Sequence, residues 1–319
     1  MAASIDWSKY KDVADKIFKS YEKEICDYRV QPKWDILEPF VIKSCPANGF
    51  ISKTQNPNEP NNLEEFAIQA EETIKAGVTS VHFHVFDDKG QPSGDLGKTR
   101  ALISPLKAKY GDKVVWDGSV ASGKTMEEAM QPIIEGLIEI AVVKPGGTFF
   151  GGSLTAWNIQ WVQAQVELIQ SLGAVPKITC HDTGYIDNAK RWLVDTGLLK
   201  KPTHWLLAVG MPGLTPMWDP MSCLETLMLM VRRVREADPD AVIMVNGGGR
   251  AHHHITAAAV LLGLHGARVG QEDCIYRYAH KDELINSTTQ IVKSTMRLVE
   301  EMGRRVATAE EYRKMIGLA

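Results

Sequence analysis

The sequence has little cysteine, and its cysteines form no recognisable set. Five cysteines are spread over 319 residues with no CxxC pair among them: Cys26, Cys45, Cys180, Cys223 and Cys274. An odd number at such wide spacing is atypical of a disulfide framework or of a zinc site built from cysteines. We therefore expect each thiol to be reduced and mostly buried.

Long apolar runs and long basic runs are also absent. Apolar stretches such as 257–264 are too short to span a bilayer, and the first ten residues lack the apolar segment of a secretion signal. The 36 Lys and Arg residues are balanced by 39 Asp and Glu residues, a formal net charge of -3. This balance argues against nucleic acid as the main partner. The sequence predicts a soluble, cytoplasmic protein without a membrane partner.

A regular alternation of β-rich and helical patterns begins after residue 38. Strands that alternate with helices predict a parallel sheet, and eight such units in about 250 residues are typical of a closed (β/α)₈ barrel. An open doubly wound sheet is the alternative. The predicted strands are Phe40–Lys43, Ser80–Val85, Lys113–Trp116, Ile140–Val143, Val175–Cys180, Trp205–Val209, Ala241–Val245 and Ala267–Val269.

The first 38 residues precede the alternating pattern. They contain a helical pattern from Trp7 to Cys26, so we interpret residues 1–38 as an added helical extension and residues 39–319 as the catalytic barrel. The catalytic residues of such barrels lie at the carboxyl ends of the strands. Candidate residues are therefore those at and after the ends of the predicted strands.

Two histidines, His82 and His84, stand two residues apart at the end of the second predicted strand. Residues at this spacing point to the same face of a strand, so both imidazoles are expected inside the barrel. Neutral imidazoles bind zinc or iron together with one or two further ligands. The segment Arg268–Asp273 follows the last strand and offers a carboxylate as the third ligand. Hydrogen-bonded core histidines and solvated charges are the alternatives.

Other interpretations of these motifs stay open. Residues Gly118–Thr125 satisfy the phosphate-loop pattern GxxxxGK[ST], although the same backbone could hold a substrate carboxylate. The histidine pair, His181 and Asp273 are similar to the ligands of metal-dependent amidohydrolase barrels, in which the pair lies on the first strand. A metal-stabilised barrel without catalytic activity is a further alternative.

Glycine-rich segments follow several of the predicted strands. Asn246–Arg250 combines flexible backbone with a cation at a helix start, which suits an anionic ligand. Lys144–Thr148 and Gly151–Ser153 form a similar loop after the fourth strand. Glycine at so many strand ends favours a ligand that approaches the backbone closely.

Taken together, the motifs resemble the β-keto acid cleavage enzymes over roughly residues 40 to 317. The resemblance implies a (β/α)₈ barrel that forms a tetramer or dimer and takes a β-keto acid and acetyl-CoA to acetoacetate and a new acyl-CoA. Its marks are Asn48-Gly49, Pro57, Pro60, Ala76-Gly77, His82-Phe83-His84, Asp88–Ser93, Gly249-Arg250, Arg268–Tyr276 and Gly303–Thr308.

The resemblance also implies roles for individual residues. It implies a zinc ion held by His82, His84 and Glu272, which would act as a Lewis acid on the keto acid. It further implies the catalytic pair Arg268 and Asp273. We interpret Asp273 as the base, because a guanidinium with a pKa above about 12 is a poor base.

The remaining assignments concern the rim of the barrel. The resemblance implies that two hydroxyl side chains polarise a substrate carbonyl, while the rim loops and an acid after the fifth strand are expected to bind substrate. The hydroxyl residues are Ser119 and Thr148, and the substrate-binding residues are Ser153, Asp182 and Arg250. In the family, an acid near the end of the first strand supports the catalytic aspartate. This chain departs from that pattern, since it has Phe50–Lys53 at the corresponding place.

Overall fold

The computed structural model describes residues 4–13, 27–48, 50–120, 125–150 and 152–318, apart from the side chains of Thr148 and Phe150. Part of the predicted N-terminal helix (14–26), part of the phosphate-loop motif (121–124) and the predicted Thr148 hydroxyl therefore lie outside the described residues. The chain divides into two compact units, Met1–Asp35 and Ile36–Ala319.

The described part of the first unit contains short helical turns. The 3₁₀ helix η1 (Trp7–Tyr10) begins after Asp6, whose carboxylate accepts a hydrogen bond from the Ser8 backbone N–H. The 3₁₀ helix η2 (Tyr28–Val30) begins in the same way after Asp27. In both turns an N-cap carboxylate satisfies a backbone donor that has no partner within the helix.

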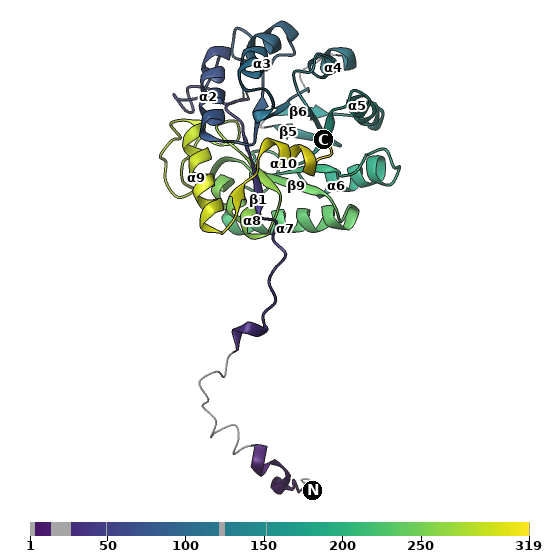
Figure 1. Ribbon diagram of the computed structural model, residues 1–319, viewed down its shortest axis with the longest axis vertical. Coiled ribbons are helices and arrows are strands. Elements are labelled where there is room, and N and C mark those ends of the chain that lie inside the picture. The colour runs from purple at the N-terminus through teal and green to yellow at the C-terminus, as the bar shows by residue number, and fades with distance from the viewer. Residues whose placement is uncertain (1–3, 14–26, 49, 121–124, 151, 319) are drawn as a thin grey trace. The chain divides into compact units, whose positions relative to one another are not determined.

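Eight parallel strands form a closed barrel in the second unit (Figure 1). Neighbouring strands pair in chain order, and the last pairs back to the first in the register Lys43↔Arg268. All eight predicted strands are observed, with ends that differ by at most two residues, so the predicted barrel is confirmed. The strands are β1 Pro39–Ser44, β2 Ser80–Phe83, β3 Val115–Gly118, β4 Ile140–Val143, β7 Val175–Cys180, β8 His204–Val209, β9 Val242–Gly247 and β10 Gly266–Val269.

Helices cover the outside of this barrel (Figure 1). Most begin at an Asn, Asp, Ser or Thr whose side chain accepts a backbone N–H of the first turn, as Asn62 does before α2. In the described part of the chain, no helix has the length and apolar composition that a bilayer crossing requires. The helices are α2 Leu63–Ala76, α3 Leu96–Tyr110, α4 Met126–Ile134, α5 Ile159–Ser171, α6 Thr183–Ala189, α7 Pro220–Ala237, α8 His252–Leu261, α9 Thr288–Glu301 and α10 Ala309–Met315.

Three short strands lie outside the predicted pattern. β5 (Gly147–Phe150) and β6 (Ser153–Ala156) form an antiparallel hairpin after β4, where the sequence predicted a glycine-rich loop. β11 (Arg305–Val306) pairs in parallel with the start of β1. The 3₁₀ helix η3 (Gly111–Lys113), the π-helix η4 (Lys190–Val194) and the 3₁₀ helix η5 (Gly249–Ala251) complete the second unit.

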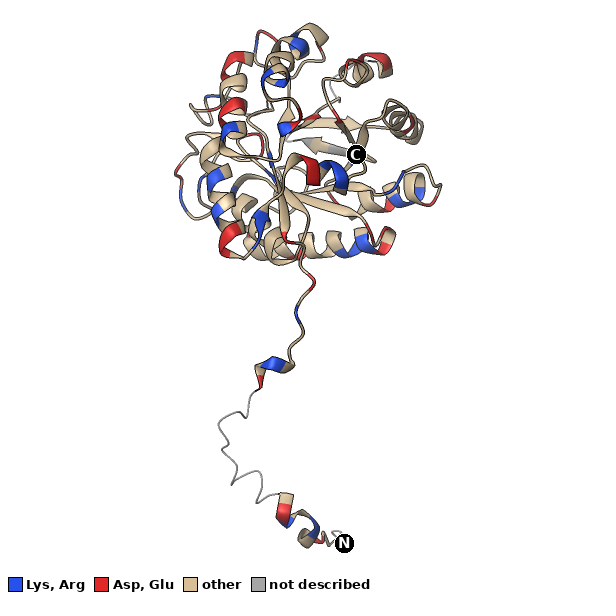
Figure 2. Ribbon diagram, viewed as in Figure 1, with Lys and Arg blue, Asp and Glu red and all other residues tan. Residues whose placement is uncertain are grey.

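The outer helices carry charges of both signs (Figure 2). Several of these charges form ion pairs between elements, such as Arg313 of α10 with Glu139 and Arg100 of α3 with Glu135. Exposed ion pairs typically contribute at most about 1 kcal/mol each. The fold therefore depends mainly on its buried side chains.

The inside of the barrel changes from apolar to polar along the strands. Val41 and Val115 belong to a buried apolar cluster at the amino-terminal half of the strands. Because strand residues alternate between two faces, the interior position that follows each of them is polar: Lys43 in β1 and Asp117 in β3. Both charged side chains are fully buried. The carboxyl-terminal half of the interior is thus a polar, largely water-excluded site.

Candidate active site

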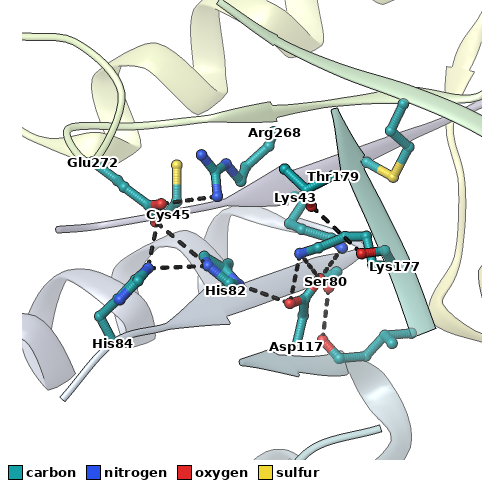
Figure 3. Close-up of polar contacts among 12 residues, drawn as sticks. Lys43, Cys45, Ser80, His82, His84, Asp117, Lys177, Thr179, Arg268 and Glu272 are labelled. Carbon is teal, nitrogen blue, oxygen red and sulfur yellow. Dashed lines mark hydrogen bonds and ion pairs between the residues drawn. The ribbon is translucent and has the colours of Figure 1, made fainter. Parts of the chain in front are cut away.

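His82 and His84 lie next to each other inside the barrel, as the spacing predicted (Figure 3). Their Nε2 atoms are 3.1 Å apart. Phe83 points the opposite way, to the helix layer, where its ring stacks on Trp116 with centroids 5.6 Å apart. This packing fixes the backbone of β2 and therefore the direction of the two imidazoles.

Glu272 approaches the histidines because the chain turns sharply after β10. Gly270 has φ +150, and a Cβ there would lie 2.2 Å from the Cys45 carbonyl oxygen. Only glycine fits so close an approach. The Glu272 backbone N–H then donates to the same carbonyl at 3.1 Å. The turn therefore brings the Glu272 side chain across to β2, with Oε1 at 3.3 Å from His84 Nε2 and Oε2 at 3.8 Å from His82 Nε2.

The separations of these three side chains suit a metal ion. Metal–ligand distances of about 2.0–2.1 Å in a tetrahedral site place neighbouring ligand atoms about 3.3 Å apart. The observed separations are 3.1, 3.3 and 3.8 Å. Among the described residues Glu272 Oε2 is buried and has no hydrogen-bond partner. His82, His84 and Glu272 can therefore hold a metal ion.

The protonation states also favour a metal ligand set. Burial lowers the pKa of His82 to about 3, so its imidazole is neutral. Burial alone would raise the pKa of Glu272, but the charge of Arg268 is the main opposing cause, and the pKa lies below its ordinary value. A neutral imidazole and an ionised carboxylate are the forms that bind metal.

Arg268 joins the metal-ligand carboxylate to a second acid. Its Nη1 lies 2.8 Å from Glu272 Oε1, while its Nε and Nη2 donate to the two oxygens of Asp273 at 3.0 and 2.5 Å. This two-bond arrangement holds the Asp273 carboxylate in one plane with the guanidinium. The pair implied by the resemblance is therefore in direct contact, beside the three candidate metal ligands.

Two further side chains hold Asp273 from neighbouring strands. The Cys45 thiol donates to Oδ2 at 3.2 Å, and the Asn246 amide donates to Oδ1 at 3.0 Å. These bonds come from the ends of β1 and β9, so a thiol and an amide support this aspartate in a chain that has Phe50–Lys53 in place of the family's acid. Burial, opposed by the charge of Arg268, raises the pKa of Asp273 to about 6.

Residues 39–318 match the family described as beta-keto acid cleavage enzyme. The chain belongs to this family. It is 30% identical to the 3-keto-5-aminohexanoate cleavage enzyme of Fusobacterium nucleatum, over 89% of this chain and 99% of that protein. It is 29% identical to the 3-dehydrocarnitine:acetyl-CoA trimethylamine transferase of Rhizobium meliloti, over 87% of this chain and 96% of that protein.

A solved structure supports the same fold. The apo structure of ObcA matches with a TM-score of 0.69 at 18% identity, over 82% of this chain and 66% of that one. The chain thus spans about two thirds of the ObcA chain, and at this identity the likeness shows the fold alone. Family membership and barrel architecture confirm the resemblance found in the sequence, and they make this chain an enzyme of the beta-keto acid cleavage family.

The hydroxyl residues assigned to the rim, Ser119, Thr148 and Ser153, lie in the segments that follow β3 and β4. Ser119 directly follows β3, and its backbone N–H donates to the Phe83 carbonyl at 3.2 Å, which places it beside the histidine strand. Ser153 is an exposed residue of β6, paired with Phe150 in the hairpin. Thr148 lies in the partner strand β5. The predicted hydroxyl residues therefore follow adjacent strands of the barrel.

Asp182 and Arg250 make structural contacts that the sequence left open. Asp182 is the N-cap of α6, and its Oδ1 accepts the Tyr185 backbone N–H at 2.9 Å. Arg250 in η5 forms an ion pair with Asp282 and lies over the Tyr276 ring, 3.8 Å from its centroid. Arg250 therefore fastens the loop that follows β10, and Asp182 starts a helix.

Sequence reasoning missed the contacts that four residues make around the ligands: Cys45, Asp117, Asn246 and Glu59. The first three lie at interior positions of buried strands, so polar residues at a spacing of two within apolar runs were the available signal. Glu59 lies in a proline-flanked loop that gives no such signal. Its carboxyl is fully buried, and burial, with a smaller contribution from Glu272, raises its pKa to about 9.

Proposed function

We propose that this chain is a zinc-dependent enzyme that converts a β-keto acid and acetyl-CoA into acetoacetate and a new acyl-CoA, and that it works as a homo-oligomer. One observation carries the proposal: the ligand atoms of His82, His84 and Glu272 lie within 4.8 Å of one another at the carboxyl end of the barrel. The Arg268–Asp273 pair lies beside them. Family membership over residues 39–318 supports the reaction class.

The reaction exchanges two acyl groups between a carbon and a sulfur. The carbon next to the substrate carboxylate loses a proton and attacks the acetyl thioester, which forms a carbon–carbon bond and releases CoA thiolate. The thiolate then attacks the original ketone, and the bond between that ketone and the same carbon breaks. Acetoacetate and the acyl-CoA of the substrate's side chain leave, and the proton returns to carbon, so atoms and charge balance.

The residues of the chain divide this work by their geometry. Zinc, when bound to the triad, would supply a Lewis acid for the oxygens of the keto acid. Asp273 would take the proton, because Arg268, Cys45 and Asn246 hold its carboxylate in one orientation beside the triad. Arg268 would stabilise the negative charge that develops on substrate oxygen.

The rim residues would position the substrate's thioester and side chain. Ser119, next to the histidine strand, and Thr148 would donate hydrogen bonds to a carbonyl oxygen. Ser153, Asp182 and Arg250 would contribute to binding through the loops that carry them. The names of both relatives specify β-keto substrates with a nitrogen substituent, and one specifies acetyl-CoA, so substrates with charged side chains belong in the test.

The decisive experiment follows the acetyl carbon. Zinc-loaded protein is given acetyl-CoA labelled with ¹³C at the carbonyl and a set of β-keto acids whose side chains are cationic, anionic or neutral. We expect the label at C3 of acetoacetate, as detected by ¹³C NMR, with one side-chain class dominating. Glu272→Ala is the control and should give no labelled acetoacetate.

Two other results would overturn the proposal. Label in free acetate would indicate thioester hydrolysis instead of acyl exchange. No turnover of any acid by protein that holds about one zinc per chain would favour amide or lactone hydrolysis, which needs no CoA.

A further inference from the structure

Asp117 makes an unusually complete set of contacts beneath the candidate metal ligands (Figure 3). Its Oδ1 lies 2.7 Å from His82 Nδ1 and 2.8 Å from Lys177 Nζ. Its Oδ2 accepts from Lys177 Nζ at 2.6 Å and from Lys43 Nζ. The carboxylate therefore spans three strands in addition to its own: β1, β2 and β7.

This cluster is so fully buried that the desolvation of its charges opposes folding. The side chains of Asp117, Lys43 and Lys177 are fully buried, and His82 is 1% exposed. Removing paired charges from water costs several kcal/mol per ion, and apolar residues of the same volume often give equal or greater stability. Stability alone therefore does not account for two lysines and an aspartate at the centre of a barrel.

The contacts determine which nitrogen of His82 carries the proton. Both lysines donate hydrogen bonds to the two oxygens of Asp117, so this side chain is the acceptor in its contacts and Oδ1 accepts from His82 as well. His82 Nδ1 is then the donor, which leaves the lone pair on Nε2. Nε2 is the atom that faces His84 at 3.1 Å and Glu272 at 3.8 Å. The tautomer that Asp117 selects is the one that can bind a metal ion at the triad.

We propose that Asp117, held by Lys43 and Lys177, is a positioning residue that fixes the tautomer and ring orientation of His82 for metal binding. The lysines occupy the remaining acceptor positions of the carboxylate, so Asp117 cannot turn towards the metal and replace a ligand. The inference rests on the proposed metal-dependent function. It concerns binding, however, and is tested without measuring the reaction.

Histidine tautomers in the unaltered, metal-free protein provide the first test. Long-range ¹H–¹⁵N correlation spectra of ¹⁵N-histidine-labelled protein distinguish Nδ1–H from Nε2–H, and His82→Gln assigns the signals of His82. We expect the Nδ1–H tautomer for His82. A proton on Nε2 would overturn the proposal. This measurement needs no variant of Asp117 and therefore stands even where such a variant does not fold.

Zinc affinity provides the second test, measured by competition with a chromophoric chelator. Asp117→Asn should weaken zinc binding by about 10- to 100-fold while one zinc still binds at saturation, as loss of such a ligand-orienting carboxylate typically does. The electronic spectrum of the cobalt-substituted variant should also shift, because the orientation of one ligand changes. Affinity within twofold of wild type, in folded protein, would overturn the proposal.

Asp238→Asn is the matched control. Asp238 is also a buried aspartate bonded by a lysine, with Lys201 Nζ at 2.7 Å, but its other side-chain partner is the Thr203 hydroxyl instead of a histidine. This variant should lose stability and keep the zinc affinity and cobalt spectrum of wild type. Protein that binds zinc as expected but forms no acetoacetate would contradict the proposed function and leave the role of Asp117 intact.

Discussion

Two buried histidines lie inside the barrel near opposite ends, His82 in β2 and His204 at the start of β8. Both are held neutral: burial lowers the pKa of His82 to about 3 and that of His204 well below its ordinary value. His82 bonds to a carboxylate and faces two further candidate ligands. His204 Nε2 lies 2.6 Å from the Tyr312 hydroxyl, which donates to the Met244 sulfur. Equal burial thus accompanies a candidate metal ligand at one end and a packing residue at the other.

The difference arises from what each end of the barrel brings near the imidazole. At the carboxyl end, the turn at Gly270 carries Glu272 and Asp273 across to neighbouring strands. At the amino end, the short helix α10 covers the barrel and contributes the apolar face of Tyr312. A buried histidine is therefore a candidate metal ligand because of the residues that the neighbouring loops bring to it, and burial alone is not sufficient.

Removing a candidate ligand should have the largest effect on this comparison. We expect His84→Ala and Glu272→Ala to lose zinc and to lower acetoacetate formation by about 10³-fold or more, because the Lewis acid is lost with its ligands. Inductively coupled plasma mass spectrometry would measure the zinc content, and steady-state kinetics would measure the rate of acetoacetate formation. Full zinc content in folded Glu272→Ala would contradict the assignment of the triad.

Removing the proposed base should have the next largest effect. Asp273→Asn keeps the size of the side chain but removes its basic oxygen, so we expect kcat to fall by about 10²- to 10⁴-fold with zinc retained. The comparison variant is Asp238→Asn. It changes a buried aspartate that precedes β9, at the amino end of the strands, and leaves the three candidate metal ligands unaltered. A kcat within tenfold of wild type for Asp273→Asn would assign the base elsewhere.

The sequence was sufficient for the framework of the site but not for its supporting contacts. The eight strands were predictable because short runs of buried apolar residues recur between helical patterns. His82 and His84 were predictable as a pair because residues two apart on one strand share a face. The bonds of Cys45 and Asn246 to Asp273 depend on how β1, β9 and β10 come together when the barrel closes, and local patterns carry no information about that.

The β5–β6 hairpin is a second feature that the local sequence did not predict. Its strands are short and not buried in the barrel: Phe149, Ser153 and Leu154 are all exposed. Gly147, one of the glycines that predicted a loop, is instead the first residue of β5. Local composition therefore indicated correctly that this segment is not a barrel strand, but it did not predict the hairpin.

Glu59 offers a test of burial, because neither of its carboxyl oxygens has a hydrogen-bond partner among the residues that the structure describes. With its pKa raised to about 9 by burial, folded protein holds a proton that the unfolded chain releases above about pH 4.5. The free energy of unfolding therefore falls as the pH rises from about 4.5, the unfolded pKa, to about 9, the folded pKa. We expect Glu59→Gln to increase the free energy of unfolding by about 4–5 kcal/mol at pH 8, with no difference near pH 4.

Urea unfolding at a series of pH values would measure this effect. Glu72→Gln, at an exposed residue in the middle of α2, is the control and should follow wild type at every pH. A constant offset between Glu59→Gln and wild type from pH 4 to pH 8 would show that the Glu59 carboxyl does not titrate as described.

Replacing the second histidine should have the smallest effect and completes the comparison. His204→Phe removes the hydrogen bond with Tyr312, so we expect a loss of about 1 kcal/mol in the free energy of unfolding. Tyr312→Phe removes the same bond, and the double variant should therefore lose less than the two single variants added together. Zinc content should stay near one per chain in all three, because His204 contacts no candidate ligand. Loss of zinc in His204→Phe with the fold intact would mean that the two ends of the barrel are coupled, and the separation between ligand and packing histidine would no longer hold.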